Sequence, residues 1–289
     1  MALRSIADLV NAENNGSFWF TSWRKNPTQI TGAGIWFDLS MSPGNPVPNY
    51  YAASPNIAVP LKQSTDGGIP HGGNVNALGY TKYLKQIVIM SNTANAAPLP
   101  SLLCDYLLYY PFVDMSITDE QFLVNTETLP RSVTGQGVRI LPVEVAGQSG
   151  VGNPQFRVTY TNSNGVSGRV TPTVSCNTQL VNGTVITSSP ATALSSGPFL
   201  PLQAGDTGVR SIDSVQFLSA DTGLIAFVLV KPIEHFALRT LGAPMERNTF
   251  VDVTKLPIIE DDAYLNVLVC PQASLASVPL HGTATFVWG

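Results

Sequence analysis

Hydrophobic and polar residues alternate along most of the second half of the chain, which is the pattern of half-buried β-strands. The apolar positions Phe156, Val158 and Tyr160 are separated by polar residues. Further short apolar runs, bounded by glycine and proline, cover residues 169–175, 214–230, 263–270 and 283–289. Strands at this spacing predict a mainly β chain, an antiparallel β-sandwich or jelly-roll-like fold.

The first residues carry the clearest helical pattern of the chain. Ser5 is suited to be an N-cap, and Ile6, Leu9 and Val10 share one face of a helix that ends at the Asn-Asn-Gly of residues 14–16. We therefore expect one short N-terminal helix. The aromatic-rich runs that follow, residues 17–23 and 34–40, predict strands.

Residues 41–79 form a long segment with six prolines, which excludes regular helix. A segment of this length in a folded protein is typically functional or an extended arm. Its apolar residues favour an arm that lies against another surface; a loop packed on its own domain is the alternative. The residues expected to make contacts in this arm are Pro46, Val47, Pro48, Tyr50 and Tyr51.

A second set of expected contacts lies in residues 169–175. Pro172 cannot donate a hydrogen bond to a neighbouring strand, so this run predicts an edge strand. Alternation places Arg169, Thr171 and Thr173 on its outward face, where we expect them to contact another subunit. The uncharged hydroxyl and amide residues around them suit such a contact.

Two turns and one boundary complete the predicted organisation. Asn-Gly at 182–183 predicts a hairpin with a type I′ turn, and Asp-Thr-Gly at 221–223 predicts another within 214–230. Composition changes near residue 145 from proline- and aromatic-rich to rich in Ser, Thr and Asn. This change predicts two β-domains, residues 1–145 and 146–289, with one continuous domain as the alternative.

Charged residues make up 12% of the chain, against about 25% in typical proteins, and the net charge is −4. This balance argues against binding to nucleic acid, which requires a basic surface. Neither a signal peptide nor an apolar run of membrane-spanning length is evident, so we expect assembly in a reducing cytoplasm. Cys104, Cys176 and Cys270 are therefore expected to be free and buried.

Catalytic and metal-binding patterns are absent from the sequence, so no cofactor or metal is expected. His71, His235 and His281 lack metal-ligand spacing and are interpreted as surface or capping residues. The acidic residues 260–262 predict a turn before a strand, with a weak cation site as the alternative. The four tryptophans favour core packing over a platform for sugars. We expect a structural or interaction protein and no enzyme.

Residues 99–116, 160–172 and 197–233 resemble segments of virion structural proteins of tailed bacteriophages. The resemblance implies a protein assembled in the host cytoplasm and present in repeated copies on the particle. It favours a capsid decoration (cement) protein that clamps neighbouring subunits, with the major capsid protein or other virion proteins as partners. A homo-oligomer such as a trimer is expected. The alternatives are a tail, neck, baseplate or fibre subunit, and a module that binds or cleaves carbohydrate on the host surface.

Overall fold

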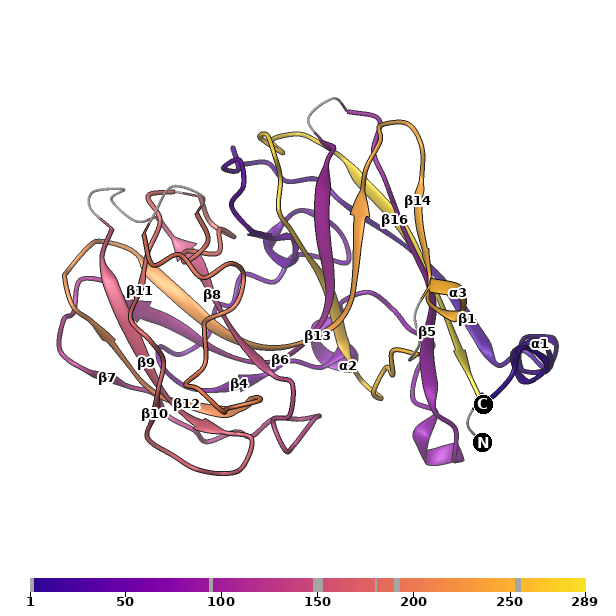
Figure 1. The fold of residues 1–289 in the computed structure, drawn as a ribbon, viewed down its shortest axis with the longest axis horizontal. Helices are drawn as coiled ribbons and strands as arrows, with labels where there is room; N and C mark the ends of the chain where they lie inside the picture. Colours follow the sequence, from indigo (N-terminus) through magenta and orange to yellow (C-terminus); the bar gives the residue numbers. More distant parts are fainter. Residues whose placement is uncertain (1–2, 94–95, 148–152, 180, 190–192, 253–255) are drawn as a thin grey trace.

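The chain folds mainly into antiparallel β-strands, with 41% of its residues in strands and 9% in helices, which confirms the predicted fold class. The computed structural model describes all residues except 1–2, 94–95, 148–152, 180, 190–192 and 253–255 (Figure 1). The short helices are α1 (Ile6–Asn14), α2 (Gln63–Asp66) and α3 (Thr249–Asp252), with 3-10 turns η1 (Leu39–Met41) and η2 (Asn76–Leu78). The jelly-roll topology stays a prediction.

Within the described residues, the strands form three sheets, which we name central, terminal and distal. The central sheet has the order β2 (Phe37–Asp38), β15 (Tyr264–Val269), β6 (Leu99–Asp114), β13 (Leu224–Leu238), β8 (Arg139–Ala146), and β4 (Val59–Pro60) also pairs with β6. The terminal sheet has the order β14 (Met245–Asn248), β5 (Lys82–Met90), β16 (Leu280–Trp288), β1 (Phe18–Lys25), β3 (Gly44–Asn45). The distal sheet has the order β10 (Arg169–Val170), β9 (Gln155–Asn162), β12 (Val209–Phe217), β7 (Gln121–Phe122), and β11 (Val174–Ser175) also pairs with β9.

The long strands β6 and β13 pair along almost their whole length and join the two lobes of the molecule (Figure 1). One end of this pair packs against the distal sheet, and the core there includes Phe156, Phe217 and Phe227. The other end packs against the terminal sheet, and Leu103 and Phe236 belong to that second core. Both lobes are therefore sandwiches that share the central sheet.

The opposite face of the central sheet carries a third core. Strand alternation places Ala226, Val228 and Val230 of β13 in it, whereas Phe227 points into the first core. Residues 41–61 cover part of this face. The predicted arm is therefore a loop packed on its own domain, because its apolar side chains fill this core.

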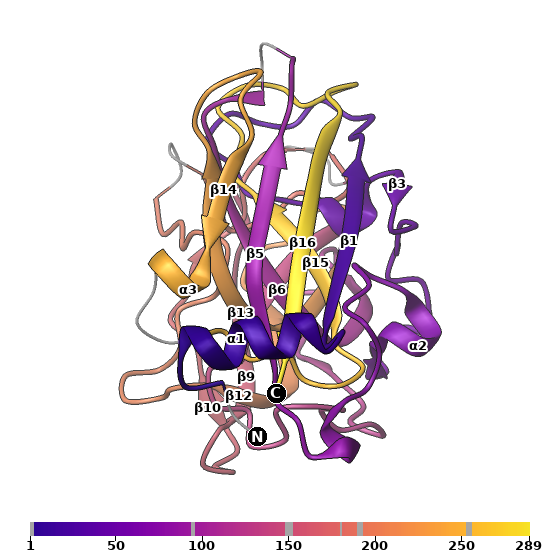
Figure 2. The ribbon, with the colours of Figure 1, turned by 90° about the vertical axis from the view of Figure 1, so that its right-hand side faces the viewer.

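Helix α1 lies across the outer face of the terminal sheet, over one end of the strands (Figure 2). Ser5 caps the helix as predicted, since its hydroxyl accepts a hydrogen bond of 3.1 Å from the Asp8 amide. Leu9 and Ala12 face the sheet, where they pack with Tyr83 and Val287. The remainder of this outer face is uncovered by any element in the described part of the chain.

The side of α1 on which the sequence places its apolar residues is largely exposed. Leu9 is buried, but Ile6 is 77% exposed and Val10 is 47% exposed. Packing onto the sheet selects the Leu9 and Ala12 side of the helix, so the face predicted from Ile6, Leu9 and Val10 is only partly correct.

The boundary predicted after residue 145 falls inside β8, which pairs with β13. Strands from 1–145 and from 146–289 alternate in the central sheet, and β16 pairs with β1 and β5 in the terminal sheet. The two predicted segments therefore do not fold as separate units. The change in composition marks the start of the distal strands instead of a boundary.

Neither predicted hairpin is present. The Val181 carbonyl accepts a 3.0 Å bond from the Thr184 amide across Asn182 and Gly183, so the turn exists. Asn182 lacks the positive φ of a type I′ turn, and Thr184 pairs with Phe37 instead of with the preceding residues. Strands β12 and β13 belong to different sheets, so residues 218–223 cross between sheets.

Residues 169–175 form an edge as predicted, because β10 and β11 both pair with β9 and are separated at Pro172. The predicted outward position of Thr171 is wrong. Its side chain is buried, and its hydroxyl accepts a 3.0 Å hydrogen bond from the Val158 amide. Val170 occupies the more exposed position, because the proline interrupts regular alternation.

Replacing Thr171 with valine should therefore lower the free energy of unfolding by about 1–3 kcal/mol, because the Val158 amide loses a buried acceptor. Thr173, which is partly exposed, gives the matched control Thr173→Val, for which we expect little change. Guanidinium denaturation of both variants measures the difference. Equal stabilities of the two variants would contradict the assigned role of Thr171.

Candidate functional site

The first candidate site is the exposed end of the loop that connects η1 to Tyr51. Val47 is 65% exposed and Tyr50 is 54% exposed, whereas Pro46 is buried and Pro48 is half-buried. We call Val47 and Tyr50 the apolar tip. Of the five contact residues predicted here, these two are the ones that the structure leaves most accessible.

Lys25, at the end of β1, holds the base of this loop. Its buried ammonium group donates hydrogen bonds of 3.1 Å to the Ser42 carbonyl and 2.8 Å to the Pro46 carbonyl. Burial lowers the pKa of Lys25 to about 8. The loop backbone is thus fixed at two points on either side of the turn.

Tyr51 holds the other end of the loop and is wrong as a contact residue, because it is fully buried. Its hydroxyl donates to Asp38 Oδ2 at 2.5 Å, and Tyr106 donates to Asp38 Oδ1 at 2.8 Å. The Ser40 hydroxyl also donates to Asp38. Burial raises the pKa of Asp38, and these hydrogen bonds oppose the rise.

Tyr50 of the apolar tip borders a small hollow of about 110 Å³. It is lined by Thr28, Gln29, Phe37, Met41, Ser42, Pro43, Tyr50 and Asn182. An aromatic side chain at the edge of a hollow, on a backbone fixed by internal hydrogen bonds, is a suitable anchor for a protein contact. This loop therefore has the features of a pre-organised binding element.

The predicted contact at Arg169 is already satisfied within the chain. Its guanidinium group donates to Asp206 at 2.9 Å, and Tyr160 and Asn162 donate to the same carboxylate. The Arg169 bond, with those from Tyr160 and Asn162, lowers the pKa of Asp206 to about 2. Thr171 is buried and Arg169 is paired, so neither side chain is available for a contact. Among the described residues, Thr173 is the one predicted contact on this edge strand that is partly exposed and has no side-chain hydrogen bond within the chain.

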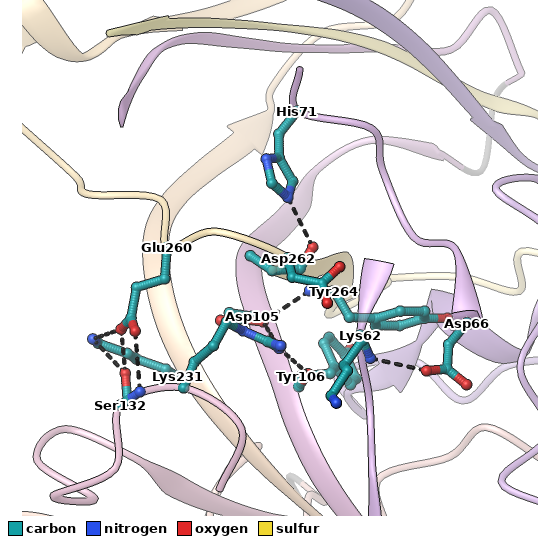
Figure 3. A network of polar contacts seen from close by, with 12 residues as sticks. Lys62, Asp66, His71, Asp105, Tyr106, Ser132, Lys231, Glu260, Asp262 and Tyr264 are labelled. Atoms are coloured by element: carbon teal, nitrogen blue, oxygen red, sulfur yellow. Dashed lines mark hydrogen bonds and ion pairs between the residues drawn. The ribbon is translucent and has the colours of Figure 1, made fainter. Parts of the chain in front are cut away.

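A second candidate site is a polar cluster where the two lobes meet (Figure 3). Asp105, in the middle of β6, accepts two hydrogen bonds from Arg131, at 3.0 and 2.7 Å, and one of 3.0 Å from the Tyr264 amide. Burial raises the pKa of Asp105 to about 6 despite the Arg131 charge. The sequence signal for this group is a carboxylate inside the apolar run of residues 101–110.

The acidic residues 260–262 form a turn before β15, as predicted, and each carboxylate binds a different loop. Glu260 accepts from Lys231 at 3.0 Å and from Ser132. Asp261 accepts from the amides of Val75 and Asn76, both at 2.9 Å. Asp262 accepts from the amide and hydroxyl of Ser64. These contacts attach the loops around residues 64, 75 and 132 to one turn.

His71 is wrong as a surface residue, because it is fully buried beside Lys82. Its Nε2 donates to the Ala263 carbonyl at 3.1 Å, and its Nδ1 accepts from Lys82 Nζ at 2.8 Å. Lys82 also donates to the Gly73 carbonyl and lies 5.8 Å from the centre of the Trp288 ring. Burial and the Lys82 charge lower the pKa of His71 to about 4.

The cluster has the character of a structural network. The oxygens of Asp105 and Glu260 and both ring nitrogens of His71 already have partners within the chain. An open depression of about 460 Å³ lies beside Glu260 and Asp261, between residues 76 and 130–134. Within the described ranges, no three His, Cys, Asp or Glu side chains are placed to hold a metal ion.

The cysteines and tryptophans differ in how far they are buried. Cys104 and Cys176 are buried as expected, and Cys270 is partly exposed. Trp23 is buried in the core as predicted, whereas Trp19 is 44% exposed, so the core interpretation is wrong for that residue. None of the helices in the described residues has the length and hydrophobicity to cross a membrane.

No protein-family model matches the chain, and no curated protein sequence matches it. Among solved structures, the VP2 subviral particle of infectious bursal disease virus aligns with 9% identity and a TM-score of 0.18, over 93% of this chain and 80% of that chain. The Gt strain of the same virus aligns with 8% identity and a TM-score of 0.17, over 94% and 81%. Similarity at this level does not establish a shared fold.

The His71–Lys82 contact predicts a stability that depends on pH. The folded protein binds fewer protons at His71 than the unfolded chain between pH 6.5 and about 4, so stability falls as the pH falls through this window. The shift sets an upper limit of about 3 kcal/mol for the loss. Asp261 opposes the effect, and Arg131 adds to it.

The measurement is the difference in unfolding free energy between the unmodified protein and His71→Gln, recorded from pH 7 to pH 4. Taking the difference cancels the opposite contribution of Asp105, whose raised pKa favours the folded state as the pH falls toward 4. We expect the advantage of the unmodified protein to shrink toward pH 4. His235→Gln, at a side chain that is 77% exposed, is the control. A difference that does not change with pH would show that His71 is not held neutral.

Proposed function

We propose that the chain is a non-enzymatic structural protein of a tailed-bacteriophage virion, a capsid decoration protein that binds neighbouring subunits through the apolar tip. The observation that carries the proposal is the exposure of Val47 and Tyr50 on a loop whose ends are fixed by Lys25 and Tyr51. The major capsid protein is the proposed partner.

The physical basis is the low entropic cost of binding through a fixed loop. A flexible arm loses conformational freedom when it binds, which reduces the affinity per unit of buried surface. The segment 41–79 is instead attached to the body, through Lys25 and Asp38 at one end and Asp261 and Asp262 at the other. Many copies on one particle would add the avidity that a small contact lacks alone.

Two sequence features support a structural role in a virion. The surface is poor in charge, which lowers the electrostatic cost of close packing between subunits. The segments 99–116, 160–172 and 197–233 resemble those of phage virion proteins. Cleavage of carbohydrate would need available carboxylates, but Glu260 and Asp261 of the acidic turn are occupied by contacts within the chain, and this favours a structural role over a hydrolytic one.

The double variant Val47→Asp/Tyr50→Ala should reduce the number of copies bound per particle by at least about tenfold, since loss of one buried aromatic anchor costs 2 kcal/mol or more. Particles that lack the protein are incubated with each purified variant, and bound copies are counted by quantitative mass spectrometry. Val133→Asp/Tyr80→Ala is the matched control, because Val133 is 70% exposed and Tyr80 is 39% exposed elsewhere on the surface.

Negative-stain images of labelled protein on the same particles give its location. Many labels over the head support the decoration role, whereas labels at one vertex would assign the protein to the tail or neck. Unreduced binding of the tip variant, with normal folding, would refute the apolar tip as the binding element.

A further inference from the structure

The uncovered outer face of the terminal sheet is a surface that the proposed function does not use. Register pairing identifies the side chains that share this face. They form rows across the strands: Ser22, Thr283, Val88 and Glu246; Phe20, Thr285, Gln86 and Asn248; and Arg24, His281 and Met90. The intervening residues, such as Trp23 and Ile89, point into the core.

Phe20, Val88 and Met90 are the apolar side chains of these rows, and all three are accessible. Phe20 is 59% exposed, Met90 is 41% exposed, and Val88 is partly exposed. A depression of about 370 Å³ lies around Ser22, Val88, Met90 and Thr283. Exposed apolar side chains that share one surface mark candidate interaction sites.

Helix α1 extends the same surface. Glu13 forms an ion pair with Lys85, two residues along β5 from Tyr83, which lies beneath the helix. The helical repeat of 100° per residue places the exposed Ile6 and Val10 on the Glu13 side of α1. The exposed flank of the helix therefore borders the uncovered part of the sheet.

Two opposite charges stand at opposite sides of the face. Arg24 is on β1, and Glu246 is on β14, with β16 and β5 between them. Three strand spacings of about 4.8 Å separate them by roughly 14 Å, too far for an ion pair within one chain. Neither side chain has an ion-pair partner among the described residues.

We infer that this face binds a second copy of the chain about a two-fold axis. An axis that lies in the face, midway between the two charges, brings Arg24 of each copy against Glu246 of the other. A surface that carries the two members of a charge pair at its opposite sides is self-complementary, as a two-fold interface requires. Phe20, Val88 and Met90 would then pack between the two sheets.

The size of the face predicts how strong the association is. Four strand spacings by about 25 Å give an area on the order of 500 Å² per copy, to which the α1 flank adds. A standard stable interface uses about 800 Å² per partner. The dimer is therefore expected to dissociate on dilution. The inference concerns a surface separate from the apolar tip and does not depend on the virion assignment.

Sedimentation equilibrium of the full chain over a series of concentrations tests the inference. The unmodified protein should form dimers as the concentration rises, and Phe20→Lys, Arg24→Glu and Glu246→Arg should each shift it to monomers. The combined Arg24→Glu/Glu246→Arg variant should dimerise again, because the charge pair is restored with reversed sign. Phe122→Lys, at a side chain 70% exposed on the distal sheet, is the control and should dimerise normally.

Three outcomes would overturn the inference: monomers at every concentration, trimers, or a double charge variant that stays monomeric. The tip variant Val47→Asp/Tyr50→Ala should dimerise normally. If the tip variant loses particle binding and still dimerises, the apolar tip binds the particle and takes no part in the dimer. If Phe20→Lys loses the dimer and still binds particles, the terminal sheet forms the dimer and is not needed for particle binding.

Discussion

The pairing of β6 with β13 is the constraint on which the rest of the structure depends. Each strand is long enough to pass through both lobes, and their register runs from Leu99–Leu238 to Asp114–Leu224. Because one face of this pair serves two cores and the other face serves a third, a change in register would move side chains of all three cores to the wrong side. The two lobes are therefore linked through the central sheet.

This shared sheet leaves the loops to be fixed by polar contacts. Charged side chains are costly to bury unless they have partners. Lys25, Asp38, Asp105 and Lys82 meet this requirement by binding backbone or hydroxyl groups of other segments of the chain. Segments that contain only short helices and strands, above all residues 41–79, are held in this way, and the apolar tip is presented by a fixed backbone.

The sequence predicted the elements better than their partners. Alternation identified β9, short apolar runs identified β15 and β16, and Ser5 identified the start of α1, because those signals are local. Whether β12 pairs with β13 or crosses to another sheet depends on three-dimensional packing, and the hairpin prediction for residues 214–230 was therefore wrong. The change in composition near residue 145 similarly contained no information about the alternation of strands in the central sheet.

The candidate site shows the same contrast between local signals, which the sequence contains, and contacts between distant segments, which it does not reveal. Val47 and Tyr50 were identified because apolar residues in a proline-rich loop are conspicuous. Tyr51, their neighbour, was misplaced because its partner Asp38 lies in a different run of the chain. Asp105 stands out within an apolar strand, so a search for charged residues at strand positions would have found it, whereas Lys82 is the first residue of β5 and carries no such signal. The identity of their partners, Arg131 and His71, requires the folded structure.

Crosslinking inside intact particles tests the central claim most directly. A photoreactive phenylalanine analogue at position 50 lies on the apolar tip, and the same group at position 80 serves as a reference elsewhere on the surface. Position 50, and not position 80, should form a covalent adduct with another virion protein on irradiation. Adducts at position 80 alone, or no adduct at position 50 with any other protein of the particle, would contradict it.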